Sequence, residues 1–220
     1  MTQSAAGDPI AHILRIDPAF QPIIADSPFC PIGNSETHPA GSHRGSDLDA
    51  QFADLVDSVV AQQLSTKAAN TICARLKAHL DGQLTPVRIL ELDDMVLRGV
   101  GLSGAKTRTI RGLAEAFHSG ALDLQPAIAA GDDTVVRTEL MRLWGIGRWT
   151  TEMFLIFTLH RMDIWPVGDL AMRRGWQQIH GRPGDIEPSE LDKLGERFRP
   201  YRSIVAWYCW RQVDGDNPSW

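Results

Sequence analysis

One carboxylate of the chain lies where it could take part in catalysis. Asp169 follows the stretch Trp165-Pro166-Val167-Gly168, in which the proline and the glycine mark a loop, and it comes where a helix should begin. Asp is a favoured N-cap residue, so a purely structural role is one interpretation. A fixed carboxylate also stabilises positive charge that develops during a reaction, and it can orient or deprotonate an attacking water molecule. The local residues leave both interpretations open.

A second stretch has the composition of an anion-binding turn between two helices. It reads Leu143-Trp144-Gly145-Ile146-Gly147-Arg148-Trp149-Thr150-Thr151. Gly145 and Gly147 permit a tight turn and the close approach of another backbone. The helix that follows begins with unpaired N–H groups and the positive end of its dipole, which together suit a phosphate. The alternative is a plain helical hairpin whose glycines only allow packing.

The charge of the chain bears on whether that phosphate could belong to a nucleic acid. The net charge is −5, and an acidic balance argues against such a partner because phosphate binding usually rests on a basic surface. A local patch still acts within the Debye length of about 8–10 Å. A site made of main-chain N–H groups also tolerates an acidic chain, so the charge does not exclude DNA.

The remaining composition bounds the compartment. No stretch approaches the ~20 apolar residues that a membrane span needs, and the first residues lack the pattern of a signal peptide. Cys30, Cys73 and Cys209 lie far apart and form neither a metal-binding spacing nor a disulfide framework. We therefore expect no membrane association and a place in the reducing cytoplasm.

The elements that must position these residues are helices. Apolar residues recur with helical periodicity along most of the chain, and no run of strand alternation is present, which predicts an all-α fold of roughly ten short helices. We expect them over 48–60, 68–80, 92–97, 104–120, 135–143, 149–159, 169–179, 187–198 and from Pro200 onward, with Ser103 as a cap. Pro31–Ser46 reads as an exposed loop and Asp214–Trp220 as a frayed tail.

Three separated motifs, in the right order, resemble one family. The hairpin resembles the L-P-G-[IV]-G-x-x-T-A signature of the helix-hairpin-helix DNA glycosylases, in the W-T form of the 3-methyladenine (alkylpurine) DNA glycosylase II branch. The stretch from Gln62 to Ala69 resembles the family's Q-Q-x-[ST]-x-K-A-A, and Val167-Gly168-Asp169 fills its catalytic position. Trp144 replaces the usual proline and Thr151 the usual alanine. The length suggests the compact form, without an additional β-rich domain.

The resemblance implies a reaction. It makes Asp169 the catalytic carboxylate, which would stabilise the oxocarbenium-like sugar formed when an N-glycosidic bond breaks. A cationic alkylated purine is already a good leaving group, which fits the absence of an obvious paired acid. Trp149 stands where strand-cutting relatives carry a Schiff-base lysine, so hydrolysis without lyase activity is expected. Relatives with an iron–sulfur cluster carry four cysteines near the C-terminus, where this chain has only Cys209, so no cluster and no required cofactor are expected.

The resemblance also assigns binding residues. Trp149, Met153 and Trp210 would line the pocket for a flipped base, although buried aromatic residues usually belong to a core. Met153 stands where some relatives have a tyrosine, so the preferred base is left open. The hairpin would bind a structural Na⁺ or K⁺ through backbone carbonyls. Those carbonyls would belong to Met141, Leu143 and Ile146.

The expected contacts with DNA come from three turns, and their residues are Gln62, Gln63, Leu64, Ser65, Lys106, Gly145, Gly147 and Trp149. Leu64 would be the wedge that fills the gap left by the flipped nucleotide, while Gln63 and Ser65 would contact the opposite strand. Ser65 could equally be an N-cap. The turn 99–106, with Lys106, Arg108 and Arg111, is either near the DNA or a plain turn with a solvated basic face.

The predicted protein has two helical subdomains that flank a DNA-binding cleft. Residues 48–160 would form the central subdomain, and 1–47 together with 161–220 the second. We expect a monomer that releases 3-methyladenine and 7-methylguanine from damaged double-stranded DNA. Two alternatives stay open: the same fold acting on neutral lesions, and a DNA-damage-binding protein without turnover. Base release from single-lesion duplexes distinguishes them.

Overall fold

A computed structural model describes residues 8–27, 29–32 and 47–214 of the 220-residue chain. Within these ranges the ordered elements are all helical and no strand is present, which confirms the predicted all-α fold. The predicted loop Pro31–Ser46 lies outside the described residues from position 33 onward, and the predicted tail lies outside them from 215. Among the described residues, no helix combines the length and the apolar character needed to cross a membrane.

The described residues divide into two compact units. One contains those up to 32 together with those from His160 onward, and the other contains those from 47 to Leu159. The first unit therefore joins the two ends of the chain. It carries Asp169, and the second unit carries the hairpin.

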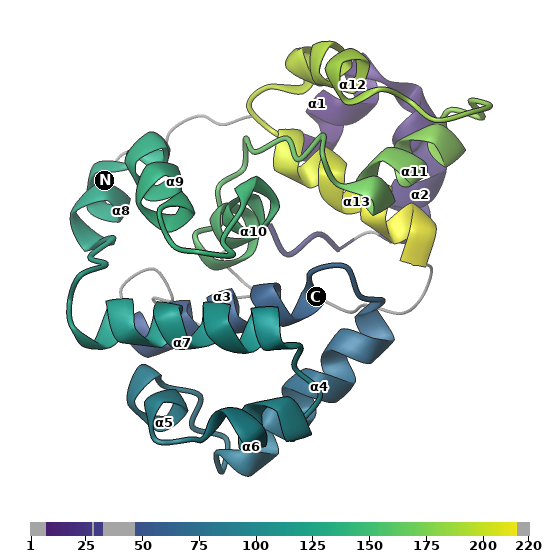
Figure 1. The fold of residues 1–220 in the computed structure, drawn as a ribbon. Helices are drawn as coiled ribbons and strands as arrows, with labels where there is room; N and C mark the ends of the chain where they lie inside the picture. Colours follow the sequence, from purple (N-terminus) through teal and green to yellow (C-terminus); the bar gives the residue numbers. More distant parts are fainter. Residues whose placement is uncertain (1–7, 28, 33–46, 215–220) are drawn as a thin grey trace. The chain divides into compact units, whose positions relative to one another are not determined.

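The second unit is built around the helices α3 and α7. Its elements are α3 (Leu48–Ala61), α4 (Thr66–His79), α5 (Pro86–Leu90), α6 (Asp94–Gly99), α7 (Gly104–His118), α8 (Gln125–Ala130), α9 (Asp133–Met141), α10 (Arg148–Met153) and the π-helical turn η2 (Phe154–Thr158). The helix α3 packs against α4, α7 and η2, while α5 and α6 pack against α7 (Figure 1). Phe52, Leu55 and Val59 on α3 are fully buried, which makes its predicted apolar stripe the core of the unit.

The first unit is built around the helices α11 and α13. Its elements are α1 (Pro9–Ile16), η1 (Pro18–Phe20), α2 (Gln21–Asp26), α11 (Leu170–Ile179), α12 (Pro188–Gly195), η3 (Glu196–Phe198) and α13 (Arg202–Asp214). The helices α11 and α13 pack side by side (Figure 1). A Cβ on Gly175 would lie 1.8 Å from the carbonyl oxygen of Cys209, so this close contact requires glycine.

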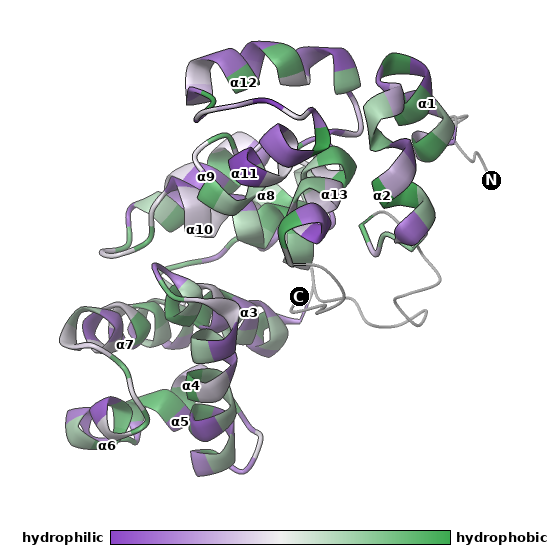
Figure 2. Cartoon of the chain, turned by 90° about the vertical axis from the view of Figure 1, so that its right-hand side faces the viewer, coloured by the Kyte–Doolittle hydropathy of each residue, from purple (hydrophilic) through white to green (hydrophobic). Residues whose placement is uncertain are grey.

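The observed helices match the predicted periodic segments and add short ones. Many helices carry both hydrophobic and hydrophilic residues, as expected of helices with one buried side (Figure 2). The predicted helix 149–159 begins at Arg148 and continues from Met153 as the π-helical turn η2. The short helices α5 and α8 were not predicted, because five or six residues are too few to show a helical period.

Candidate functional site

Asp169 caps α11 and is bound by a second donor. Its Oδ1 accepts a hydrogen bond from the backbone N–H of Met172 at 2.7 Å, which confirms the N-cap interpretation. The same oxygen accepts a hydrogen bond from the indole Nε1 of Trp210 at 2.9 Å. The side chain is nearly buried, with 9% of the residue exposed. Two donors therefore fix the carboxylate in one orientation, which is what an electrostatic catalyst needs.

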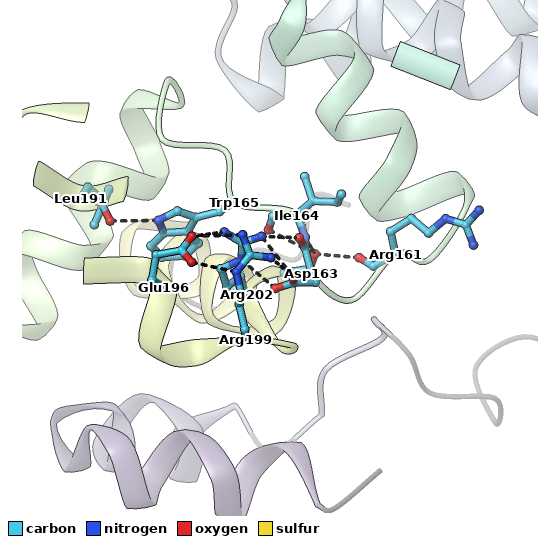
Figure 3. Close-up of polar contacts among 9 residues, drawn as sticks. Arg161, Asp163, Ile164, Trp165, Leu191, Glu196, Arg199 and Arg202 are labelled. Carbon is cyan, nitrogen blue, oxygen red and sulfur yellow. Dashed lines mark hydrogen bonds and ion pairs between the residues drawn. The ribbon is translucent and has the colours of Figure 1, made fainter. Parts of the chain in front are cut away.

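The loop that leads to Asp169 is fastened to the start of α13 by Ser203. The Ser203 hydroxyl donates to the carbonyl of Arg161 at 2.6 Å and accepts from the N–H of Ile164 at 2.9 Å. The Ser203 backbone N–H donates to the carbonyl of Met162 at 2.9 Å. Figure 3 shows these loop residues converging on the beginning of α13. Ser203 is fully buried, so its hydrogen bonds are shielded from competing water.

Ion pairs strengthen the same junction (Figure 3). The nearly buried guanidinium of Arg202 donates to the two carboxylate oxygens of Asp163 at 2.6 and 3.1 Å and to its carbonyl at 3.0 Å. Glu196 pairs with Arg199 and Arg202, and the hydrogen bond from Arg199 lowers the pKa of Glu196. The helix α13 thus holds the loop near its first residues and holds Asp169 through Trp210.

The loop is also packed against α12. The indole Nε1 of Trp165 donates to the carbonyl of Leu191 at 3.0 Å (Figure 3). A Cβ on Gly195 would lie 2.1 Å from that indole nitrogen, so glycine makes room for the ring. Trp165 is therefore a core residue that fixes the loop, which is the more common role of a buried tryptophan.

In the second unit, the two hairpin glycines differ in what requires them. Gly145 has a φ of +82°, and a Cβ there would lie 2.0 Å from the Thr109 Oγ1 on α7. Gly147 has an extended backbone, with φ −105° and ψ −178°, and beyond its chain neighbours no described atom lies within 4 Å of the position that a Cβ would take. The fold therefore requires Gly145, whereas Gly147 leaves open space at the start of α10.

Gln62 ties the α3–α4 turn to the hairpin. Its Nε2 donates to the carbonyl of Gly145 at 3.0 Å and to Thr150 Oγ1 at 2.9 Å. The neighbouring Gln63 is exposed, with a φ of +56°, and Leu64 is 40% exposed. Ser65 Oγ accepts from the N–H of Ala68, which confirms its role as the cap of α4. The turn thus presents Gln63 and Leu64 to solvent while Gln62 anchors it.

Lys106 fastens the same turn from α7. Its Nζ donates to the carbonyls of Val60 at 2.7 Å and Gln62 at 2.8 Å. Desolvation by burial lowers the pKa of Lys106. Ser103 caps α7, as predicted. The ammonium that was expected to contact DNA therefore has two partners inside the protein, which favours a positioning role for Lys106.

Each unit carries part of the predicted base pocket. Asp169 and Trp210 lie in the first unit, where their hydrogen bond brings them together and 2% of Trp210 is exposed. Trp149 and Met153 lie in the second unit, half-buried and buried respectively. That all four line one pocket stays a prediction.

Glu152 is a buried charged residue of the hairpin helix that none of the sequence motifs indicated. The residue is 2% exposed, and its Oε1 accepts a hydrogen bond from Arg148 Nε at 2.7 Å. The same oxygen forms a longer ion pair with Arg137 Nη1 at 3.9 Å. The i, i+4 spacing of Arg148 and Glu152 was the signal that could have found this pair. The pair thus links the first residue of α10 to the fifth.

The three cysteines are protonated thiols at neutral pH. Burial raises the pKa of Cys30 and Cys73 to about 12 and raises that of Cys209 as well. No cluster of three or more His, Cys, Asp or Glu side chains suited to a metal is found in the described part of the chain.

The hairpin carbonyls are the predicted ligands of a monovalent cation. The carbonyl of Leu143 accepts a hydrogen bond from the N–H of Ile146 at 3.1 Å. A carbonyl oxygen has a second lone pair, so this turn remains compatible with a monovalent cation.

Comparisons with known proteins agree with this architecture. DNA-3-methyladenine glycosylase 1 of Schizosaccharomyces pombe is 34% identical over 171 residues, which cover 77% of this chain and 75% of the relative. The structure of the S. pombe 3-methyladenine DNA glycosylase (Mag1) in complex with abasic DNA matches 92% of this chain and 95% of that one, with 31% identity and a TM-score of 0.78. DNA-3-methyladenine glycosidase of Bacillus halodurans matches 98% of this chain and 94% of its own, with 29% identity and a TM-score of 0.71.

The helices, the glycine hairpin and the fixed aspartate define a helix-hairpin-helix protein. Residues 56–200 match the family model described as HhH-GPD superfamily base excision DNA repair protein. The chain belongs to this superfamily, as its three motifs predicted.

Proposed function

We propose that the protein is a monofunctional DNA-3-methyladenine glycosylase. It hydrolyses the N-glycosidic bond of cationic alkylated purines, such as 3-methyladenine and 7-methylguanine, in duplex DNA and so begins base excision repair. One observation carries the proposal: Asp169 is held by two N–H donors at the end of a loop that α13 fixes at several points. The names of the related proteins support the same substrate class.

The chemistry follows from that carboxylate. As the glycosidic bond breaks, positive charge develops on the sugar, and a fixed anion lowers the energy of this state. The carboxylate also orients or deprotonates the water that attacks the sugar. The leaving base carries its own positive charge, so it departs without a general acid. Trp149 and Trp210 supply indole surfaces that favour a cationic base.

The absence of strand cleavage is part of the proposal. Trp149 occupies the position at which strand-cutting relatives carry their lysine. Lys106 is the lysine that lies closest to Trp149 in the sequence. It belongs to α7, and its ammonium donates to two backbone carbonyls, so it is not free to form a Schiff base. The product is therefore an abasic site with the DNA strand intact.

Double-stranded DNA with a damaged base is the proposed partner, bound by a monomer. The turn that presents Gln63 and Leu64 is the proposed wedge, with Leu64 as the plug, and the open space at Gly147 suits the approach of the phosphate backbone. Met141, Leu143 and Ile146 would hold a structural Na⁺ or K⁺ through their carbonyls, and that cation would support the turn.

A panel of duplexes that differ only in one lesion tests the proposal. Under single-turnover conditions we expect release of 3-methyladenine to be faster than release of hypoxanthine, after correction for spontaneous loss. Equal or faster release of hypoxanthine would contradict the preference for cations and favour the alternative of neutral lesions. Binding without release of any base would favour a damage-binding protein.

Asp169→Asn is the matched variant for this panel. Asn also caps helices, so we expect normal folding and lesion binding but no base release. Base release by the variant at the wild-type rate would remove Asp169 from the mechanism.

Borohydride tests the absence of strand cleavage in the wild-type protein. Added during the reaction, it should trap no covalent adduct between protein and DNA, since no Schiff base forms.

A further inference from the structure

An exposed indole at the hairpin carries an arginine on its face. Trp144, which stands where the family signature has proline, is 51% exposed and directly precedes Gly145. The Arg108 guanidinium carbon lies 4.2 Å from the centre of the Trp144 ring. This distance is within the range of a cation–π contact.

The residues next to Arg108 and Trp144 hold these two side chains beside each other. Thr109 follows Arg108 on α7, Gly145 follows Trp144 in the hairpin, and a Cβ on Gly145 would clash with Thr109 Oγ1. The absence of that Cβ lets α7 pack directly on the turn. The place of Arg108 beside the hairpin is thus set by the packing of the second unit and does not rest on one flexible side chain.

Arg108 differs in its partners from Lys106 and Arg111, the lysine and the other arginine on α7. Lys106 donates to two backbone carbonyls, and Arg111 is bound by the Asp94 carboxylate and the Leu92 carbonyl. Within the described ranges, no ion pair joins Arg108 to a carboxylate. None of the described carboxylates therefore neutralises its charge.

We propose that Arg108, held on Trp144, is a binding site for a phosphate group of the DNA backbone next to the hairpin. Stacking occupies the flat face of a guanidinium and leaves the N–H groups along its edge, which match two phosphate oxygens. The indole limits the rotamers that Arg108 must give up on binding. This inference rests on the proposed function in so far as DNA is the partner.

The test is a salt titration of binding to an undamaged duplex. Each phosphate neutralised by an arginine steepens the log–log salt slope by about 0.9, so we expect Arg108→Gln to lower the slope by that amount and to raise Kd about tenfold at low salt. We expect Trp144→Leu to raise Kd as well. The double variant should bind no more than twofold more weakly than Arg108→Gln, because both changes remove one site.

Arg142→Gln is the matched control. Arg142 lies two residues before Trp144, is 71% exposed at its side chain and is paired with Glu139, so its removal should leave the slope unchanged. An unchanged slope in Arg108→Gln, an equal loss in the control, or additive losses in the double variant would each overturn the proposal. Base release at saturating enzyme separates this inference from the proposed function. A wild-type protein that binds undamaged DNA but releases no base refutes the glycosylase assignment alone, whereas the salt slope of Arg108→Gln on an undamaged duplex tests this inference alone.

Discussion

The role of Asp169 depends on which atoms hold its carboxylate. A capping aspartate needs only the N–H of Met172, yet the Trp210 indole donates to the same oxygen from a helix 41 residues away in sequence. Capping and catalysis are therefore compatible in one residue, because the cap fixes the direction of the charge. The buried Trp210 has a polar role in addition to any contact with a base.

Trp210→Phe tests that polar role. The substitution keeps an aromatic ring but removes the N–H donor. Hydrogen bonds to charged groups contribute roughly 1.5–3 kcal/mol, and about 1.4 kcal/mol corresponds to tenfold in rate. We expect the single-turnover rate of 3-methyladenine release to fall about tenfold or more, with affinity for lesion-free DNA unchanged.

The control for this variant is Trp207→Phe on the same helix. The Trp207 ring contacts Tyr208 and Arg211, so its loss should leave the rate within about twofold of wild type. If Trp210→Phe kept the wild-type rate, Trp210 would act through its ring surface only.

Lys106→Met separates a positioning lysine from one that contacts DNA. Methionine fills similar space but leaves the carbonyls of Val60 and Gln62 without the ammonium. We expect the free energy of unfolding to fall by roughly 1–3 kcal/mol in urea titrations, with the salt slope of DNA binding unchanged. Lys67→Met, an exposed lysine on α4, should not change stability. A slope lower by about 0.9 in Lys106→Met would instead show a direct phosphate contact.

At the scale of elements, the two glycines of the hairpin differ in what the fold requires of them. Gly145 has a left-handed φ and is packed against Thr109, so the connection between α9 and α10 depends on it. Gly147 has neither constraint within the described residues. In the signature G-x-G, the fold thus requires the first glycine, whereas a requirement for the second would have to come from a binding partner.

Alanine at each position should give opposite results. Gly145→Ala should lower the thermal midpoint, because a left-handed φ alone costs roughly 1–2 kcal/mol and the clash with Thr109 adds to it. Gly147→Ala should keep the wild-type midpoint, yet raise Kd for duplex DNA several-fold because its methyl group occupies the open space. Wild-type affinity in Gly147→Ala would show that no backbone approaches there.

At the scale of the molecule, several basic side chains are bound inside the protein and are therefore not available to neutralise DNA phosphates. Lys106 and Arg111 have partners in the second unit, and Arg199 and Arg202 are paired in the first. We expect a shallow salt dependence of DNA binding overall, well below that of a protein with eight phosphate contacts through basic side chains. Fluorescence titrations between 50 and 200 mM salt, roughly the range in which such slopes are resolved, provide the measurement.

The buried thiols predict how stability changes at high pH. The pKa of Cys73 is raised to about 12 in the folded protein, and the unfolded value is near 9.0. Between these values only the unfolded chain loses the proton, so the free energy of unfolding falls as pH rises from 9 to 12. Urea titrations of wild type and Cys73→Ala should converge over this range. A constant difference between them would contradict the raised pKa.

The sequence by itself determined the local features of this protein. The helical stripes of α3 and α4 and the caps at Ser65, Ser103 and Asp169 follow from periodicity and from side chains that bond to nearby N–H groups. Family membership was also predictable, because the motifs lie in continuous stretches of chain. Short helices such as α5 were missed for lack of a period.

Only the tertiary structure decided which groups meet across the chain. The bond from Trp210 to Asp169, the bonds from Lys106 to Val60 and Gln62, and the stacking of Arg108 on Trp144 join residues that are far apart in sequence. No local pattern encodes such pairs, because they depend on how helices pack and on which direction each side chain takes. Lys106 and Arg108 lie two residues apart on one helix, and packing alone gave the first two internal acceptors and left the second on an exposed indole.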